Sequence, residues 1–331
     1  MGHMFFNALP YRGPASDHFD GTRFRNLEST KHGTPGSLLK WMMNRDRGSW
    51  ASVQAEPGPP PPERVGAGEC RVTFVGHATL LVQVAGLNLL TDPVWAKRVG
   101  PKSKVGPKRY RPPGLRFDDL PPIDAVLLSH NHYDHLCEHT MRRLARRHQP
   151  TVVTGLGNAQ LLTTFDVDDA RDLDWWDETT LDTGTGEVVV TAVPMRHFSG
   201  RGPGDRDRTL WCGLHVAHPS GAILFAGDTG YGDHFEAIRE RLGAPRLALL
   251  PIGAYRPRFM MRAIHVDPAE AVQAHLDLEA ETSVAMHFGT FPLADDGMEE
   301  PERDLAAALQ ERGVDSEAFR VLPHGEGVNV P

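Results

Sequence analysis

Long hydrophobic runs are missing from this sequence, and cysteines are few. No uninterrupted apolar stretch among the 331 residues approaches the roughly 18 that a transmembrane helix needs. The three cysteines, Cys70, Cys137 and Cys212, are too few for a disulfide framework, and each lies beside apolar neighbours. We expect no secretory signal, and a reduced protein that is cytoplasmic or bound peripherally to a membrane.

An excess of basic residues is also missing. The net charge is -8 and the isoelectric point is about 6.1, whereas proteins that bind nucleic acids generally carry a basic domain. The sequence also lacks a Gly-x-Ser-x-Gly elbow and a Walker phosphate loop, and its glycine-rich segments do not fit a dinucleotide site. We therefore expect no nucleic-acid partner, no serine hydrolase and no NAD chemistry.

Glycine, proline and charge dominate residues 1–69, which end in the proline-rich linker 57–62. We predict that 1–69 is an N-terminal arm and that 70–331 is the main body of the protein. Within the arm, Leu38, Leu39, Trp41, Met42 and Met43 lie among Lys40, Arg45 and Arg47. This segment predicts a short helix that docks on the body or touches a membrane surface, and docking is our preferred interpretation.

Strand-like patterns begin at residue 71 and later alternate with helical ones. The expected strands are 71–75, 79–84, 88–91, 124–129, 151–154, 187–193, 210–217, 222–226, 246–250 and 283–286. The expected helices are 138–148, 233–242, 268–280 and 302–312, and Asp267 should cap the third. This mixture indicates an α/β (α+β) fold in which two sheets pack together with helices outside.

Four metal-ligand side chains follow the apolar run 125–128 within six residues: His130, His132, Asp134 and His135. The run predicts a buried strand, so the four side chains lie on the loop at its end. Three imidazoles and a carboxylate crowded together would repel one another and leave polar groups unsatisfied unless a cation bound them. The pattern indicates a metal site.

Three further candidate ligands, His197, Asp228 and His287, each follow another predicted strand. We assign His130, His132 and His197 to a first metal, and Asp134, His135 and His287 to a second, with Asp228 as the bridging carboxylate. Imidazole-rich ligation favours zinc, so we expect two Zn²⁺ per chain, although iron or manganese could occupy the same ligands. Two such ions can share one hydroxide.

These residues resemble the metallo-β-lactamase superfamily, and more narrowly its N-acylphosphatidylethanolamine-hydrolysing phospholipase D group. The similar segments span about residues 70–327 and include 76–79, 90–93, 106–109, 173–176, 225–231, 251–255, 265–268 and 287–291. Arg196, Phe198 and Phe288 depart from the Gln and Trp residues that the group tends to carry. The resemblance implies a four-layer αββα sandwich with a dimetal site at one edge between its sheets.

The resemblance also implies a phosphodiesterase in which a metal-bridging hydroxide attacks phosphorus without a protein nucleophile. Asp134 would orient that hydroxide, and His265, in a family-like segment, would hydrogen-bond the phosphoryl group or assist the leaving alkoxide. His77 is a weaker candidate for the same role as His265, and we prefer a structural role in which it braces the metal loop. Asp92 could support a ligating histidine or simply cap a turn.

Two groups of basic residues could attract an anionic substrate. Arg256, Arg258, Phe259 and Met260 precede His265 and could seat a lipid phosphate with its chains, or pack on the core. Eight basic residues without an acid lie between Lys97 and Phe117 and could attract anions or form a solvated loop. Both interpretations of the second group stay open.

We predict hydrolysis of a phosphodiester, as in an N-acylphosphatidylethanolamine-like glycerophospholipid, with peripheral membrane contact. Alternatives are a sugar-phosphate lactonase and, less well supported, a nuclease, for which the acidic balance is unfavourable. A non-catalytic metal-binding or lipid-sensing module is a different class, and the complete set of seven ligands argues against it. The sequence does not indicate an oligomeric state.

Overall fold

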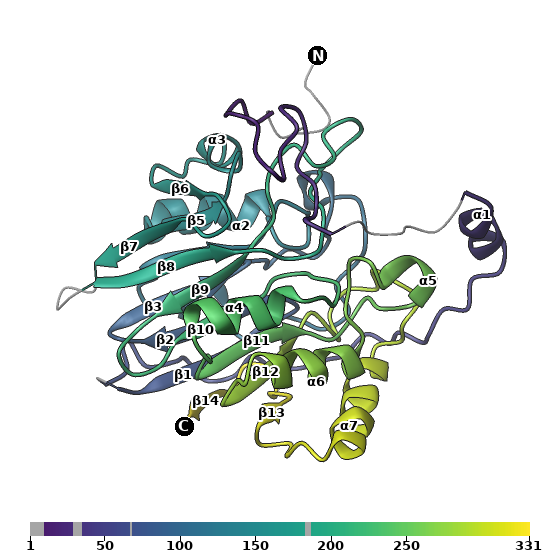
Figure 1. Ribbon diagram of the computed structural model, residues 1–331. Coiled ribbons are helices and arrows are strands. Elements are labelled where there is room, and N and C mark those ends of the chain that lie inside the picture. The colour runs from purple at the N-terminus through teal and green to yellow at the C-terminus, as the bar shows by residue number, and fades with distance from the viewer. Residues whose placement is uncertain (1–9, 29–34, 67, 183–186) are drawn as a thin grey trace.

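A computed structural model describes residues 10–28, 35–66, 68–182 and 187–331 (Figure 1). Within these ranges two seven-stranded sheets pack together. The first has the order β14 (Gly327–Val330), β1 (Cys70–Gly76), β2 (Thr79–Val84), β3 (Leu87–Thr91), β4 (Ala125–Leu128), β5 (Thr151–Gly155) and β6 (Ala170–Leu173). The second has the order β13 (Phe319–Arg320), β12 (Thr282–Met286), β11 (Leu247–Pro251), β10 (Ile223–Phe225), β9 (Gly213–Ala217), β8 (Glu187–Val193) and β7 (Glu178–Asp182).

Helices cover the outer faces of both sheets, which completes the predicted αββα sandwich (Figure 1). Helices α2 (Glu138–Arg147) and α3 (Ala159–Thr163) pack on the first sheet, and α4 (His234–Leu242), α6 (Pro268–Asp277) and α7 (Glu300–Arg312) pack on the second. Helices α1 (Pro35–Met43) and α5 (Arg258–Met261) lie beside the sheets and cover neither face (Figure 1). As predicted, Asp267 caps α6, in a reciprocal capping box with Glu270.

Alternating side chains of the first sheet belong to two different cores. Leu80 of β2 and Leu89 of β3 lie in the core shared with the second sheet, whereas Leu81 and Leu90 pack with α2 and α3. This follows from the two-residue period of a strand, which sends successive side chains to opposite faces. Because both faces are covered, β2 and β3 are apolar throughout most of their length.

Most predicted elements occur within a few residues of their expected positions, and the differences are local. The strand expected at 210–217 begins at Gly213, and the helix expected at 268–280 ends at Asp277. Strands β6, β7, β13 and β14 and helices α3 and α5 were not predicted. The strand ends that carry the candidate ligands are where the sequence pattern placed them.

The arm contacts the body along much of its described length, and backbone hydrogen bonds join Gly48 to Asp295, Val53 to Tyr110 and Gly58 to Gly114. The predicted short helix is present as α1, where the Trp41 indole donates to Asp295 and Nε of Arg45 donates to the same carboxylate at 2.9 Å. The side chains of Leu38 and Met42 lie outside the described part of the chain. Further upstream, Phe19 and Phe24 are buried in the main core, so this part of the arm packs as part of the body.

Candidate metal centre

The seven predicted ligands converge at one edge of the sandwich, where strands of both sheets end. Four lie on the loop after β4, and one each follows β8, β10 and β12. All seven side chains are buried or half-buried. Segments far apart in the sequence therefore meet at a single site, which is the usual place for ligands in sheets of this kind.

The backbone turns sharply where two strands enter the site. His77, directly after β1, and His287, directly after β12, have φ angles of 60° and 62°. The left-handed region is sparsely populated by residues other than glycine and costs on the order of 1–3 kcal/mol each. His287 N donates to His77 O at 2.8 Å, which fixes the two turns against each other.

Glycine is required directly before Asp228. Gly227 has a φ of 64°, and a Cβ atom there would lie 2.4 Å from Cβ of Ser129. No larger residue could bring the loop after β10 so close to the loop after β4. The close approach of these two loops places Asp228 beside His135.

The first predicted metal group is assembled in the structure. Nδ1 of His132 lies 2.8 Å from Nε2 of His130 and 3.3 Å from Nε2 of His197. Around a tetrahedral zinc with bonds of about 2.0–2.1 Å, ligand nitrogens lie about 3.3 Å apart. The two observed nitrogen–nitrogen distances equal this value or are slightly shorter, so the three rings are spaced nearly as ligands of one zinc ion.

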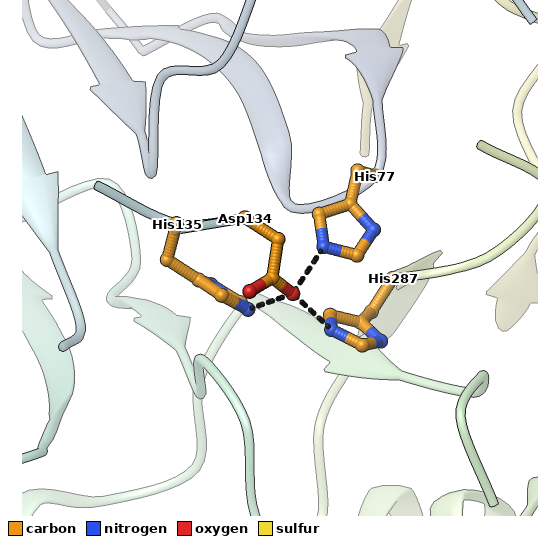
Figure 2. Close-up of side chains that lie close together, drawn as sticks. All are labelled: His77, Asp134, His135 and His287. Atoms are coloured by element: carbon orange, nitrogen blue, oxygen red, sulfur yellow. Dashed lines mark hydrogen bonds and ion pairs between the residues drawn. The ribbon is translucent and has the colours of Figure 1, made fainter. Parts of the chain in front are cut away.

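The second predicted group is assembled as well, around Asp134 (Figure 2). Oδ2 of Asp134 lies 3.4 Å from Nε2 of His135 and 3.6 Å from Nε2 of His287. His77 also reaches this carboxylate, with Nε2 3.0 Å from Oδ2. His77 was considered from its sequence position as a brace, and the structure places it in direct contact with a candidate ligand.

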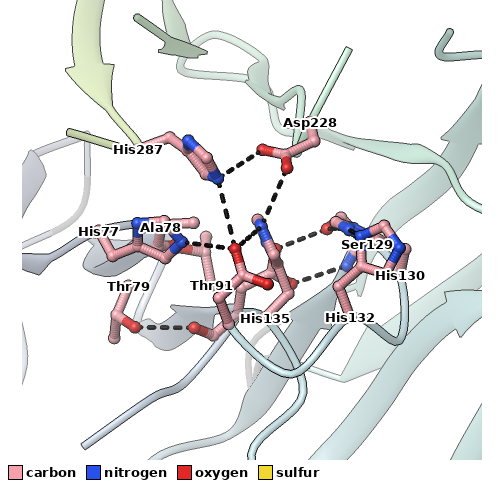
Figure 3. Close-up of polar contacts among 12 residues, drawn as sticks. His77, Ala78, Thr79, Thr91, Ser129, His130, His132, His135, Asp228 and His287 are labelled. Carbon is pink, nitrogen blue, oxygen red and sulfur yellow. Dashed lines mark hydrogen bonds and ion pairs between the residues drawn. The ribbon is translucent and has the colours of Figure 1, made fainter. Parts of the chain in front are cut away.

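Asp228 lies between the two groups, as expected for a bridging carboxylate (Figure 3). Its Oδ2 is 3.2 Å from Nε2 of His135 and 3.7 Å from Nε2 of His197, and its Oδ1 is 3.2 Å from Nε2 of His287. One carboxylate thus contacts histidines of both groups. This juxtaposition requires an ordered arrangement of four separate loops, those after β4, β8, β10 and β12.

Several buried atoms of this site lack a hydrogen bond within the described ranges. They are Nε2 of His135, Oδ1 of Asp228, both ring nitrogens of His287 and Nδ1 of His265. Unpaired buried polar atoms are costly and uncommon in folded proteins. Nε2 of His135 and Nε2 of His287 each lie 3.2 Å from an oxygen of Asp228, so the residues fit a pair of divalent cations.

Burial governs the protonation of the first group. It lowers the pKa of His132 to about 3 and that of His197 to about 4, and it holds the pKa of His130 well below its ordinary value. All three imidazoles are therefore neutral at pH 7. Neutral rings offer the lone pairs that a metal requires.

Nearby charges, and not burial, determine the protonation of the second group. Burial lowers the pKa of His287, but the carboxylates of Asp228 and Asp134 outweigh burial and raise it to about 9. The pKa of His135 is raised well above its ordinary value in the same way. Two carboxylates are balanced here by two protonated imidazoles, so a metal that bound would displace protons.

Outer hydrogen bonds fix which ring nitrogen of a histidine faces the site. Nδ1 of His135 bonds Oδ2 of Asp92 at 2.5 Å, and Nδ1 of His197 bonds the carbonyl oxygen of Ile264 at 2.9 Å. In both residues Nε2 is thereby left to point inward. Asp92 thus contacts the candidate ligand His135, and its role as support for a metal ligand stays a prediction.

His265 lies at the rim of both groups. Its ring centroid is 5.1 Å from that of His197 and 5.4 Å from that of His287, and its Nδ1 is 3.9 Å from Oδ2 of Asp228. Burial holds its pKa well below the ordinary value. The ring is therefore neutral and lies beside the candidate bridging carboxylate Asp228.

The predicted phosphate-binding arginines have acidic partners. Arg256 pairs with Glu300 at 2.8 Å, and Arg258 pairs with Glu270 at 2.6 Å while donating to the carbonyl of His265 at 2.9 Å. Phe259, beside the half-exposed Met260, is 48% exposed. Arg258 braces the loop that carries His265, and the phosphate-binding role of both arginines stays a prediction.

A profile described as "Beta-lactamase superfamily domain" matches residues 87–288. Among similar curated proteins, an N-acyl-phosphatidylethanolamine-hydrolyzing phospholipase D 1 of Caenorhabditis elegans is 37% identical over 67% of this chain and 64% of that protein. A UPF0173 metal-dependent hydrolase of Methanopyrus kandleri is 30% identical over 77% of this chain and 98% of its own length. The chain spans less than two thirds of the phospholipase D relative.

Solved structures share the fold. Igni18, a metallo hydrolase from Ignicoccus hospitalis, has a TM-score of 0.57 and 25% identity, covering 79% of this chain and 98% of that one. An isothiocyanate hydrolase from Delia radicum gut bacteria has a TM-score of 0.62 and 21% identity, covering 78% and 98%. Each match covers more than three quarters of this chain and is consistent with the architecture described above.

Proposed function

Because the chain belongs to the metallo-β-lactamase superfamily of metal-dependent hydrolases, we propose that it hydrolyses a phosphodiester of an N-acylphosphatidylethanolamine-like glycerophospholipid. The products would be a phosphatidic acid and the freed head group. One observation carries the hydrolytic part of the proposal: Asp228 contacts histidines of both ligand groups. The similarity to a phospholipase D of this type supports the choice of substrate.

Zn²⁺ bound by the two groups would lower the pKa of a water molecule and offset the charge of the phosphoryl oxygens. The chain's own residues would position the reactants. Asp134 carries a pKa held well below its ordinary value, because the nearby His135 charge outweighs the effect of burial. The carboxylate therefore stays ionised, and it can orient an attacking water by accepting a hydrogen bond from it.

His265 would act on the phosphodiester, whereas Asp134 acts on the attacking water. Its neutral ring has a buried Nδ1 without a hydrogen-bond partner, so it can bond a phosphoryl or leaving-group oxygen. Arg258 fixes its backbone through the carbonyl oxygen. We therefore assign Asp134 to the attacking water and His265 to the phosphodiester.

Exposed apolar side chains near α1 and α5 support a lipid substrate. Leu39, Met43 and Phe259 are 58%, 70% and 48% exposed, and a pocket of about 380 Å³ between the two helices is lined by Trp41, Phe259 and Arg256. Apolar residues flanked by arginine suit the boundary of a phospholipid layer. In the described ranges no helix is long and apolar enough to cross a membrane.

A substrate panel combined with elemental analysis tests the proposal. Purified protein would be assayed on phosphodiester lipids, sugar-phosphate lactones and RNA, and its metal content would be measured on the same preparation. We expect about two metal ions per chain and turnover of the phosphodiester lipid. Turnover confined to lactones or to RNA would overturn the substrate assignment, and two bound metals without turnover would favour a binding module.

A further inference from the structure

Part of the N-terminal arm contacts the metal centre, although the superfamily match begins only at residue 87. Residues 10–28 lie against the loop between β8 and β9 (Figure 1). There Asn26 reaches the segment that carries His197, the first-group ligand that comes from outside the loop after β4. The arm therefore contributes contacts to a site assembled mainly from the body.

The side-chain amide of Asn26 bonds both backbone polar groups of His197. Oδ1 of Asn26 accepts from His197 N at 3.1 Å, and its Nδ2 donates to His197 O at 3.0 Å. Oδ1 also accepts from the indole of Trp211 at 3.2 Å. In the described residues no backbone group bonds His197 N or O. Asn26 therefore supplies the hydrogen-bond donor and acceptor that the backbone of a neighbouring strand would otherwise supply.

Asn26 is itself held by a rigid part of the arm. Phe19 and Phe24 are 1% and 3% exposed in the main core, and Phe24 N donates to Asp207 O at 2.7 Å. Nε2 of His18 lies 2.6 Å from Oδ1 of Asp174. An amide anchored in this way can resist displacement of the loop that it bonds.

We propose that Asn26 is a positioning residue for the first metal site, acting through the backbone of His197. The inference rests on the proposed function, in which His197 is a metal ligand. His130 and His132 are close neighbours on one loop, so the geometry of this group depends on where the third ligand is held. Partners outside the ligand shell commonly contribute about 10- to 100-fold to metal affinity.

Zn²⁺ titration of metal-free protein tests the proposal, with a chromophoric chelator as competitor. Asn26→Ala removes both bonds to His197, whereas Asn26→Asp keeps the side-chain volume and loses the donor. We expect both variants to weaken one of the two Zn²⁺ sites by about 10- to 100-fold and to leave the other close to wild type. Thr22→Ala is the matched control, because Thr22 is exposed and bonds only Asp20 among the described contacts.

Wild-type affinity at both sites in the two Asn26 variants would overturn the proposal. Equal weakening of both sites would also overturn it, because that result indicates general loosening. A loss in Asn26→Ala that Asn26→Asp does not share would overturn the role of the donated bond to His197 O and assign the positioning to the Oδ1 acceptor, which aspartate keeps. The readout is independent of substrate: if the wild-type chain binds two Zn²⁺ but cleaves no phosphodiester, the proposed function fails while the role of Asn26 is still decided.

Discussion

Nδ1 of His135 lies 2.5 Å from Oδ2 of Asp92, and both side chains are completely buried. Asp92 also accepts from Ser129 N at 2.8 Å and from Ser129 Oγ at 2.5 Å. One carboxylate therefore orients a second-group ligand and fixes the start of the loop that carries four ligands. This contact turns Nε2 of His135 toward Asp134 and Asp228.

Replacing Asp92 by Asn should weaken metal binding without removing any ligand. The amide cannot supply the negative charge that His135 faces, and its NH₂ group lacks an acceptor at that position. We expect about a 10- to 100-fold loss of Zn²⁺ affinity, measured by chelator competition. Ser129→Ala, which removes one of the three hydrogen bonds to Asp92, should have a smaller effect. Unchanged affinity in Asp92→Asn would show that this contact is not required.

Asp134→Ala should abolish most turnover while the fold is retained. Asp134 carries the ionised carboxylate at the centre of the second group, and groups that hold a proton in the transition state commonly contribute about 10²- to 10⁴-fold. The measurement is kcat on the phosphodiester lipid, with circular dichroism as the fold check. Exposed Asp168, changed to Ala, is the control. Wild-type turnover in Asp134→Ala would remove this residue from the mechanism.

His265→Ala should lower kcat by about 10²-fold with two metal ions still bound. Its Nδ1 lies at the rim, 3.9 Å from Oδ2 of Asp228, and all seven candidate ligands remain in place. Metal content and kcat would be measured on the same samples, with exposed His139→Ala as the control. If the variant lost one metal ion, His265 would be a ligand and not a group that contacts substrate.

The arm should be held more tightly at acidic than at alkaline pH, because of His18. Burial lowers the pKa of His18, but hydrogen bonds to Asp174 and Asp17 outweigh burial and raise it above its ordinary value. The stability gained is fully present below the unfolded-state pKa of about 6.5 and is lost as pH rises through the folded-state pKa. His18→Asn should therefore lower the melting temperature more at pH 5.5 than at pH 8.5. An equal decrease at both pH values would contradict this linkage.

The sequence pattern predicted the sheets where strands are apolar, and it failed where they are polar or very short. β2 and β11 are buried at every position, whereas β6 and β7 are mostly half-buried or exposed, and β13 has only two residues. Such strands depend on pairing with neighbours, which a local pattern does not encode. Conversely, the pattern placed candidate ligands at the ends of apolar strands, and the structure brings these side chains together.

Supporting residues of the site were harder to predict than ligands. The cluster after β4 is visible because its side chains are adjacent in sequence, and the position of His287 repeats the same arrangement. Asn26 carries no such signal, since its role depends on a contact across 171 residues. His77 could be suspected from its family-like segment, but its bond to Asp134 depends on a positive φ angle after β1.

Phe259→Ser should impair action on lipid in vesicles and spare the chemistry itself. Phe259 is 48% exposed and lines the pocket beside Trp41. Removing its ring reduces the apolar surface available to a membrane, and complete burial of such a side chain contributes a free energy of about 1.5–3 kcal/mol. We expect a several-fold increase in KM for vesicle substrate, with kcat on a short-chain soluble phosphodiester unchanged. Val321→Ser, at another exposed apolar position far along the chain, is the matched control. An equal loss on both substrates would place Phe259 in the catalytic site, and no loss on either would exclude this surface from lipid contact.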